Sequence, residues 1–266
     1  MLIKTTQAGG LIVEEAENLL LEKCIEKTGN NDGQCIKDIV QEYADMYGRN
    51  LVRSKNQYAY CAMTVSVIIG RALARLGIVN QLYDAGAGNL ITNAKKLGIR
   101  VDKKPAPGAI MLSRSSTGSG YHAEIVWYVR DNKIGTIGGN TTGYILEPDG
   151  CVKKAPREGI VAKERTSKSV AWYVHAEEIE GQDFSVNGNR ELEHTGLITA
   201  YGGTIGSLSE DEWWVGQYCE FNWPPMDTTD EESPDDTFDE NGEVKSNLGL
   251  IALIAGGIFG IYLLVK

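Results

Sequence analysis

The sequence has little of the chemistry that marks several large protein classes. It contains only three histidines, and no cysteine or histidine pair has the spacing of a zinc ribbon, so we expect no metal and no cofactor. Acidic residues outnumber basic ones by 36 to 26, which gives a formal net charge of −10, and no basic stripe is present. Because binding to phosphates requires such a stripe, we expect no nucleic acid partner.

Two further absences concern export and disulfides. Residues 1–10 contain one lysine and no apolar run long enough for a secretory signal, so export by that route is not expected. The chain has five cysteines at irregular spacing: Cys24, Cys35, Cys61, Cys151 and Cys219. An odd number without a recognisable pattern is a poor disulfide framework, so we expect at least one free thiol.

The order of the predicted elements places helices before strands. Apolar spacing predicts helices over residues 11–27, 35–47, 61–76 and 90–97, of which the third is apolar enough to be buried. The period then changes to that of short strands, over residues 108–112, 121–130, 133–137, 143–146 and 170–174. The sequence therefore predicts an α+β fold in which helices pack on an antiparallel sheet.

The expected domain organisation has five parts. A helical hairpin over residues 1–50 precedes a catalytic domain over 51–180 and an extension of unknown role over 181–225. Residues 226–247 are acidic and have few large apolar side chains, which predicts a disordered linker because little surface can be buried. The fifth part, residues 248–265, is apolar throughout.

This last segment is long enough to cross a membrane. Its 18 residues carry no charge, and at about 1.5 Å each they span about 27 Å, close to a hydrocarbon core of about 30 Å. We expect a single-pass C-terminal transmembrane helix in a virion or bacterial host membrane, with a buried core helix as the alternative. Ala252, Gly256 and Gly260 recur at four-residue spacing, a pattern that permits weak self-association.

Cys61 is the candidate nucleophile, because it opens the predicted helix 61–76, where the helix dipole lowers the pKa of a thiol. A small core residue is the alternative. His122, at the start of a predicted strand, is the candidate base, and strand alternation places Glu124 on the same face. A turn at residues 131–133 returns the chain, so that Asn140 comes level with His122 and can orient its ring.

Four motifs in this region resemble the CHAP and NlpC/P60 group of peptidoglycan-cleaving enzymes. They are Tyr-Cys-Ala at 60–62, Pro-Ala-Pro-Gly at 105–108, Gly-Tyr-His at 120–122 and Gly-Gly-Asn at 138–140. The resemblance implies a papain-like fold over about residues 58–178 and a Cys61, His122 and Asn140 triad. Glu124, Tyr60 and Gln57 are auxiliary candidates. Some members carry a glutamate where this chain has Gly138, and that role would fall to Glu124 or be absent.

The function that this resemblance implies is hydrolysis of an amide bond through a thioester. The expected protein is a membrane-anchored N-acetylmuramoyl-L-alanine amidase or endopeptidase that acts on the peptidoglycan peptide stem, as a phage lysis or entry protein. The backbone N–H of Cys61 is the expected oxyanion donor. Two alternatives stay open: an intracellular thiol hydrolase or acyltransferase of the same fold, and a membrane structural protein with an inactive catalytic fold.

Overall fold

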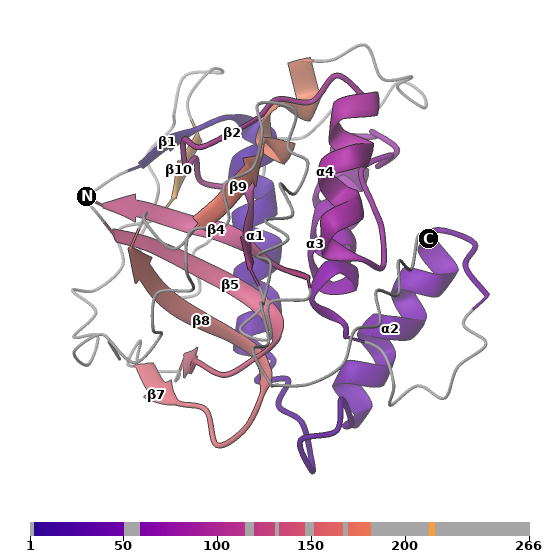
Figure 1. The fold of residues 1–266 in the computed structure, drawn as a ribbon, viewed down its shortest axis with the longest axis vertical. Coiled ribbons are helices and arrows are strands. Elements are labelled where there is room, and N and C mark those ends of the chain that lie inside the picture. Colours follow the sequence, from indigo (N-terminus) through magenta and orange to yellow (C-terminus); the bar gives the residue numbers. More distant parts are fainter. Residues whose placement is uncertain are drawn as a thin grey trace, which may run out of the picture. The chain divides into compact units, whose positions relative to one another are not determined.

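The computed structural model describes residues 3–50, 59–114, 120–130, 133–146, 152–166, 170–181 and 213–215. All of them belong to the first of the two units into which the chain divides, Met1–Glu231 and Glu232–Lys266. Within these ranges the structure has four α-helices and an eight-stranded antiparallel sheet, which Figure 1 shows with α2, α3 and α4 gathered at one side.

The fold class predicted from the sequence, a papain-like domain with a C-terminal transmembrane helix, is wrong. The structure shows an eight-stranded antiparallel sheet with four helices, whereas the sequence indicated only five strands. Strands were missed where charged side chains hide the alternation, above all over residues 159–166. Among the described residues no helix has the length and apolarity needed to cross a membrane. Residues 226–247 and 248–265 lie outside the described residues.

The helices lie near the predicted positions. They are α1 (Gln7–Leu21), α2 (Gln34–Met46), α3 (Cys61–Arg75) and α4 (Ala87–Lys96). Helix α1 begins earlier than predicted because Thr6 caps it: its hydroxyl oxygen accepts a hydrogen bond from the Gly9 N–H at 3.0 Å. Local side-chain capping therefore compensates for Gly9 and Gly10, which are weak helix formers.

The large sheet has the strand order β2-β9-β3-β4-β5-β8-β6-β7, with every paired strand antiparallel. The bounds are β2 (Val101–Asp102), β3 (Ile110–Arg114), β4 (Tyr121–Arg130), β5 (Lys133–Thr141), β6 (Tyr144–Leu146), β7 (Val152–Lys154), β8 (Gly159–Thr166) and β9 (Val170–Val174). A 3-10 helix, Ala176–Gly181, follows β9, and a separate two-stranded sheet pairs β1 (Ile3–Thr5) with β10 (Trp213–Val215).

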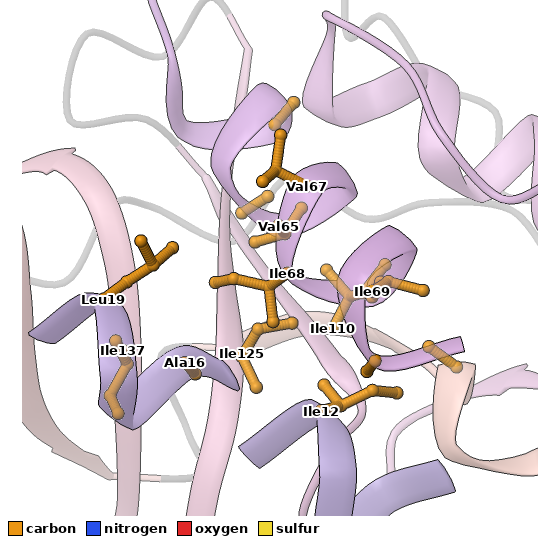
Figure 2. Packing of buried hydrophobic residues seen from close by; sticks show 14 of the residues in the cluster. Ile12, Ala16, Leu19, Val65, Val67, Ile68, Ile69, Ile110, Ile125 and Ile137 are labelled. Atoms are coloured by element: carbon orange, nitrogen blue, oxygen red, sulfur yellow. The ribbon is translucent and has the colours of Figure 1, made fainter. Parts of the chain in front are cut away.

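The main core lies between the sheet and helices α1 and α3. Figure 2 shows Ile12 of α1 and Ile68 of α3 directed toward Ile125 of β4, and all three side chains are fully buried. Helix α3 is buried along most of its length because α2 packs on it as well. The helices of residues 1–50 thus share one core with the elements that hold Cys61 and His122.

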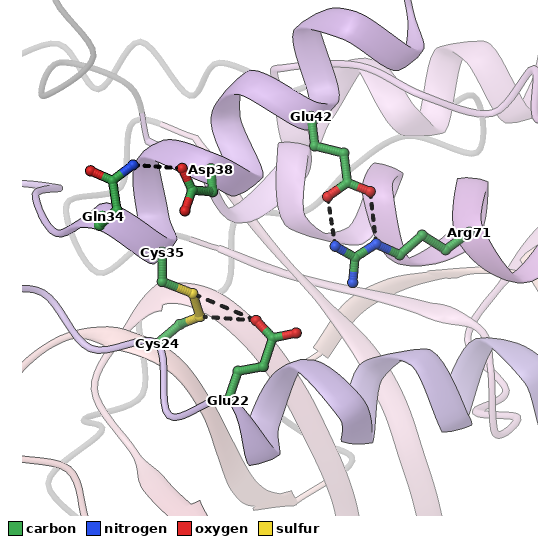
Figure 3. The surroundings of a disulfide bond; sticks show 7 residues. All are labelled: Glu22, Cys24, Gln34, Cys35, Asp38, Glu42 and Arg71. Carbon is green, nitrogen blue, oxygen red and sulfur yellow. Dashed lines mark hydrogen bonds and ion pairs between the residues drawn. A yellow bond between two sulfur atoms is a disulfide. The ribbon is translucent and has the colours of Figure 1, made fainter.

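A disulfide joins the end of α1 to the start of α2. Cys24 and Cys35 are bonded, with their Cα atoms 5.5 Å apart (Figure 3). This pair has no spacing signature in the sequence, because it is set by the packing of two helices. Cys61 is a free, buried thiol, whereas Cys151 and Cys219 lie outside the described residues. Beside the disulfide, Arg71 of α3 donates to both carboxylate oxygens of Glu42 of α2, at 2.7 and 2.6 Å.

Glu17 of α1 makes the folding stability depend on pH. Its Oε1 accepts a hydrogen bond from Trp127 Nε1 at 2.6 Å, yet burial raises the pKa of the carboxyl to about 8. The unfolded chain ionises this group near the ordinary value of 4.5, so the free energy of unfolding should fall as pH rises from 4.5 to about 8.

We expect Glu17→Gln, which keeps an acceptor for Trp127, to flatten this pH dependence. Urea unfolding at pH 5 and at pH 8 measures it. The variant should be more stable relative to the parent at pH 8 than at pH 5. At the higher pH, folding of the parent requires the Glu17 carboxyl either to stay charged while buried or to take up a proton. If the free energy of unfolding changes by the same amount between pH 5 and pH 8 in both proteins, this assignment is wrong.

Candidate active site

Helix α3 places the thiol of Cys61 at its first turn. The side chain is 6% exposed, and its sulfur is hydrogen-bonded by the ring of His122 and by the backbone N–H groups of Ala62 and Ala123. These contacts come from two elements, the start of α3 and the start of β4. The structure therefore brings together the two residues that the sequence argument named as nucleophile and base.

His122 bridges the thiol and a carboxylate. Its Nε2 lies 3.0 Å from Oε1 of Glu124, which leaves Nδ1 as the ring nitrogen for Cys61. Burial lowers the pKa of His122, but the hydrogen bonds to Cys61 and Glu124 raise it to about 9. Burial likewise raises the pKa of Cys61, yet His122 and the backbone N–H groups lower it below the ordinary value. The pair is polarised toward thiolate and imidazolium.

Glu124 is the buried anion behind His122. Its side chain is 1% exposed, and Arg165 of β8 donates to both carboxylate oxygens, each at 2.9 Å. Thr136 Oγ1 donates to Oε2 at 2.6 Å. Burial raises the pKa of Glu124, but the charge of Arg165 and the bond to His122 hold it well below the ordinary value. Glu124 is therefore ionised; its Oε1 is shared by His122 and Arg165, and its Oε2 accepts from Arg165 and Thr136.

Glycine on the neighbouring strand makes room for this carboxylate. A Cβ at Gly138 of β5 would lie 2.5 Å from Cγ of Glu124, so any larger residue would displace it. Gly138 thus leaves space for the side chain of Glu124, which reaches this place from β4. Sequence alternation, which put His122 and Glu124 on one face, was the signal for this contact.

Among the described residues, no hydrogen bond joins the side chain of Asn140 to His122. It has a left-handed backbone, with φ of 60°, next to a shift in register of β5 against β8. Within the described part of the chain its buried Oδ1 has no hydrogen-bond partner. Its backbone N–H instead donates to the hydroxyl of Tyr60. Glu124, and not Asn140, is the residue that bonds the distal ring nitrogen of His122.

The remaining candidates are placed as follows. Tyr60 is completely buried directly before Cys61, and Gln57 lies outside the described residues. Arg165 was missed by the sequence argument, because β8 was not predicted. His175 is also buried, but it lies between Asp102 at 2.7 Å and Glu177 at 2.6 Å, where it ties β2 to the segment after β9.

No family model matches the chain, and comparisons with curated proteins and with solved structures found no match. The resemblance to the CHAP and NlpC/P60 group therefore stays a prediction based on the four motifs. The chemistry that the site can support follows from the positions of Cys61, His122, Glu124 and Arg165.

Proposed function

We propose that the chain is a cysteine hydrolase that cleaves amide bonds through a thioester intermediate. The observation that carries this proposal is the contact chain from the Cys61 thiol through His122 to Glu124, with Nε2 and Oε1 separated by 3.0 Å. Arg165 neutralises Glu124 on its other side. A buried thiol, imidazole and paired carboxylate in this order match the requirements of an activated nucleophile.

The mechanism follows from the positions of these groups. The Cys61 thiolate attacks the amide carbonyl, and His122 gives its proton to the leaving amine as the thioester forms. His122 then takes a proton from the water that hydrolyses the thioester and returns the thiol. Glu124 keeps the ring orientation and stabilises the imidazolium. The backbone N–H of Cys61 is the proposed donor to the oxyanion.

Peptidoglycan is the substrate class that we propose, with the peptide stem as the bound part. Two observations support it. The sequence motifs resemble wall-cleaving enzymes, and the Cys24–Cys35 disulfide is of a kind that persists in oxidising surroundings outside the reducing cytosol. The disulfide favours action at the cell wall over the intracellular thiol hydrolase that the sequence also allowed.

Digestion of purified peptidoglycan by the full chain tests the proposal. We expect new amino groups and soluble fragments, whose masses distinguish amidase from endopeptidase cleavage. Alkylation with iodoacetamide should abolish the release, whereas a chelator should leave it unchanged. Activity that survives complete alkylation, or that a chelator removes, would contradict cysteine catalysis. Cleavage of small acyl esters without any action on peptidoglycan would contradict the substrate class alone.

A further inference from the structure

The residue before the nucleophile sets the start of helix α3. Tyr60 is completely buried, and its carbonyl oxygen accepts hydrogen bonds from the backbone N–H of Thr64 at 2.8 Å and from Thr64 Oγ1 at 2.9 Å. These bonds close the first turn of the helix, of which Cys61 is the first residue. A shift of Tyr60 would therefore move Cys61 relative to His122.

The side chain of Tyr60 is held from two sides. Its hydroxyl donates to Glu26 Oε1 at 3.0 Å and accepts from the backbone N–H of Asn140. Strand β5 also touches the ring, since a Cβ at Gly139 would lie 2.9 Å from it. Tyr60 thus links the helix of the nucleophile to the strand that neighbours β4.

Glu26 is an unusual partner for this hydroxyl. It is 3% exposed, and its second oxygen accepts from the Asn31 N–H at 3.0 Å, so both of these partners are neutral. Burying a carboxylate against neutral donors costs more than burying an apolar side chain of the same size. Among the described residues, the bond from Tyr60 is what connects this carboxyl to the start of helix α3.

Glu26 is in turn fixed by its surroundings. Its backbone N–H donates to the carbonyl of Glu158 at 2.9 Å, and the preceding residue, Ile25, forms an antiparallel bridge with Gly159 at the start of β8. The Cys24–Cys35 disulfide closes the loop that contains Glu26 (Figure 3). The loop is therefore anchored at both the sheet and helix α2.

We propose that Glu26 and Tyr60 are positioning residues for the nucleophile, with the disulfide-closed loop 24–35 as their anchor. Glu26 fixes the hydroxyl of Tyr60, Tyr60 fixes the first turn of α3, and the thiol of Cys61 is thereby held against His122. This inference rests on the proposed function. It adds a second buried carboxylate that acts on the side of the thiol, whereas Glu124 acts on the side of the imidazole.

The rate at which iodoacetamide alkylates Cys61, measured against pH, tests the inference without a substrate. We expect Tyr60→Phe and Glu26→Gln to lower this rate by roughly 10- to 100-fold at neutral pH, because small misplacements of reacting groups have effects of that size. The apparent pKa of the thiol should rise, since the contact with His122 is what lowers it. On peptidoglycan, kcat should fall with little change in KM.

Tyr47→Phe is the matched control. The hydroxyl of Tyr47 donates to the carbonyl of Ser66 in α3 at 2.7 Å and accepts from Asn80 at 2.8 Å. Its loss removes a comparable hydrogen bond without touching the first turn of α3. The control should therefore keep both the alkylation rate and the apparent pKa of Cys61.

The outcomes separate this inference from the proposed function. Slow alkylation of Cys61 in the parent, at the rate of an ordinary thiol, would sink the proposed function. Fast alkylation in the parent and equally in folded Tyr60→Phe and Glu26→Gln would overturn only the positioning role. If Tyr60→Phe does not fold, Glu26→Gln decides, because it preserves side-chain shape. A double Cys24→Ala and Cys35→Ala variant with the parental rate would overturn the part assigned to the disulfide.

Discussion

Cys61→Ala should abolish measurable hydrolysis of peptidoglycan, and His122→Ala should lower turnover by on the order of 10⁴, because each removes an obligate part of one covalent mechanism. Both variants should remain folded. The Cys61 thiol is small, and His122 lies at the start of β4, where its side chain retains 14% exposure. Release of amino groups from peptidoglycan measures the activity, and thermal unfolding measures the fold.

Asn140→Ala is the control for this comparison. Alanine keeps the backbone N–H that donates to Tyr60, so the loss of turnover should be far smaller than in His122→Ala. The variant should unfold more easily, since alanine tolerates the left-handed backbone less well than asparagine. Full activity in Cys61→Ala would place the nucleophile elsewhere. A loss in Asn140→Ala equal to that in His122→Ala would return Asn140 to the orienting role.

Nucleophile and base could be placed from sequence because their signals are local. Helix α3 begins at Cys61 and strand β4 at Tyr121, as predicted, since an uninterrupted apolar run and a regular alternation mark both elements. The antiparallel pairing of β4 with β5 also followed from the turn at residues 131–133. These elements are enough to bring Cys61 close to His122.

The orienting residue could not be chosen in the same way. A hairpin argument assumes regular register and backbone, but β4 and β5 shift in register between Val126 and Tyr128. Asn140 also takes a left-handed backbone, beside the shift of β5 against β8. That irregularity has no clear sequence signal. The competing candidate, Glu124, was visible from alternation, yet its advantage comes from Arg165, a residue 41 positions away.

Strand β8 was missed for a related reason. Its second half, Lys163, Glu164 and Arg165, has the composition of an exposed segment. In the structure each charge has a distant partner: Lys163 donates to Thr141 Oγ1 at 2.6 Å, Glu164 accepts from Tyr128 at 3.0 Å, and Arg165 pairs with Glu124. Such pairings depend on strand order, which composition and periodicity do not determine.

Arg165→Met should destabilise the fold by about 3–5 kcal/mol, because it leaves Glu124 as a buried charge without its main counter-charge. The exposed fractions support a value of this size, since the side chains of Arg165 and Glu124 are only 12% and 1% exposed. The pKa of Glu124 should rise at the same time, since the charge of Arg165 is what lowers it most. Urea unfolding at neutral pH measures the loss.

A double variant, Glu124→Gln with Arg165→Met, separates stability from catalysis. Removing both charges should recover most of the free energy of unfolding, yet activity should stay low because glutamine cannot stabilise the imidazolium of His122. Lys163→Met is the control, since it removes a neighbouring cation of β8 that donates to Thr141 Oγ1, and it should cost about 1 kcal/mol. Two results would show that Arg165 and Glu124 are not coupled. One is an equal loss of stability in Arg165→Met and Lys163→Met. The other is a loss in the double variant that equals the sum of the losses in Glu124→Gln and Arg165→Met. The assignment of Glu124 as the anion behind His122 would then lose its energetic basis.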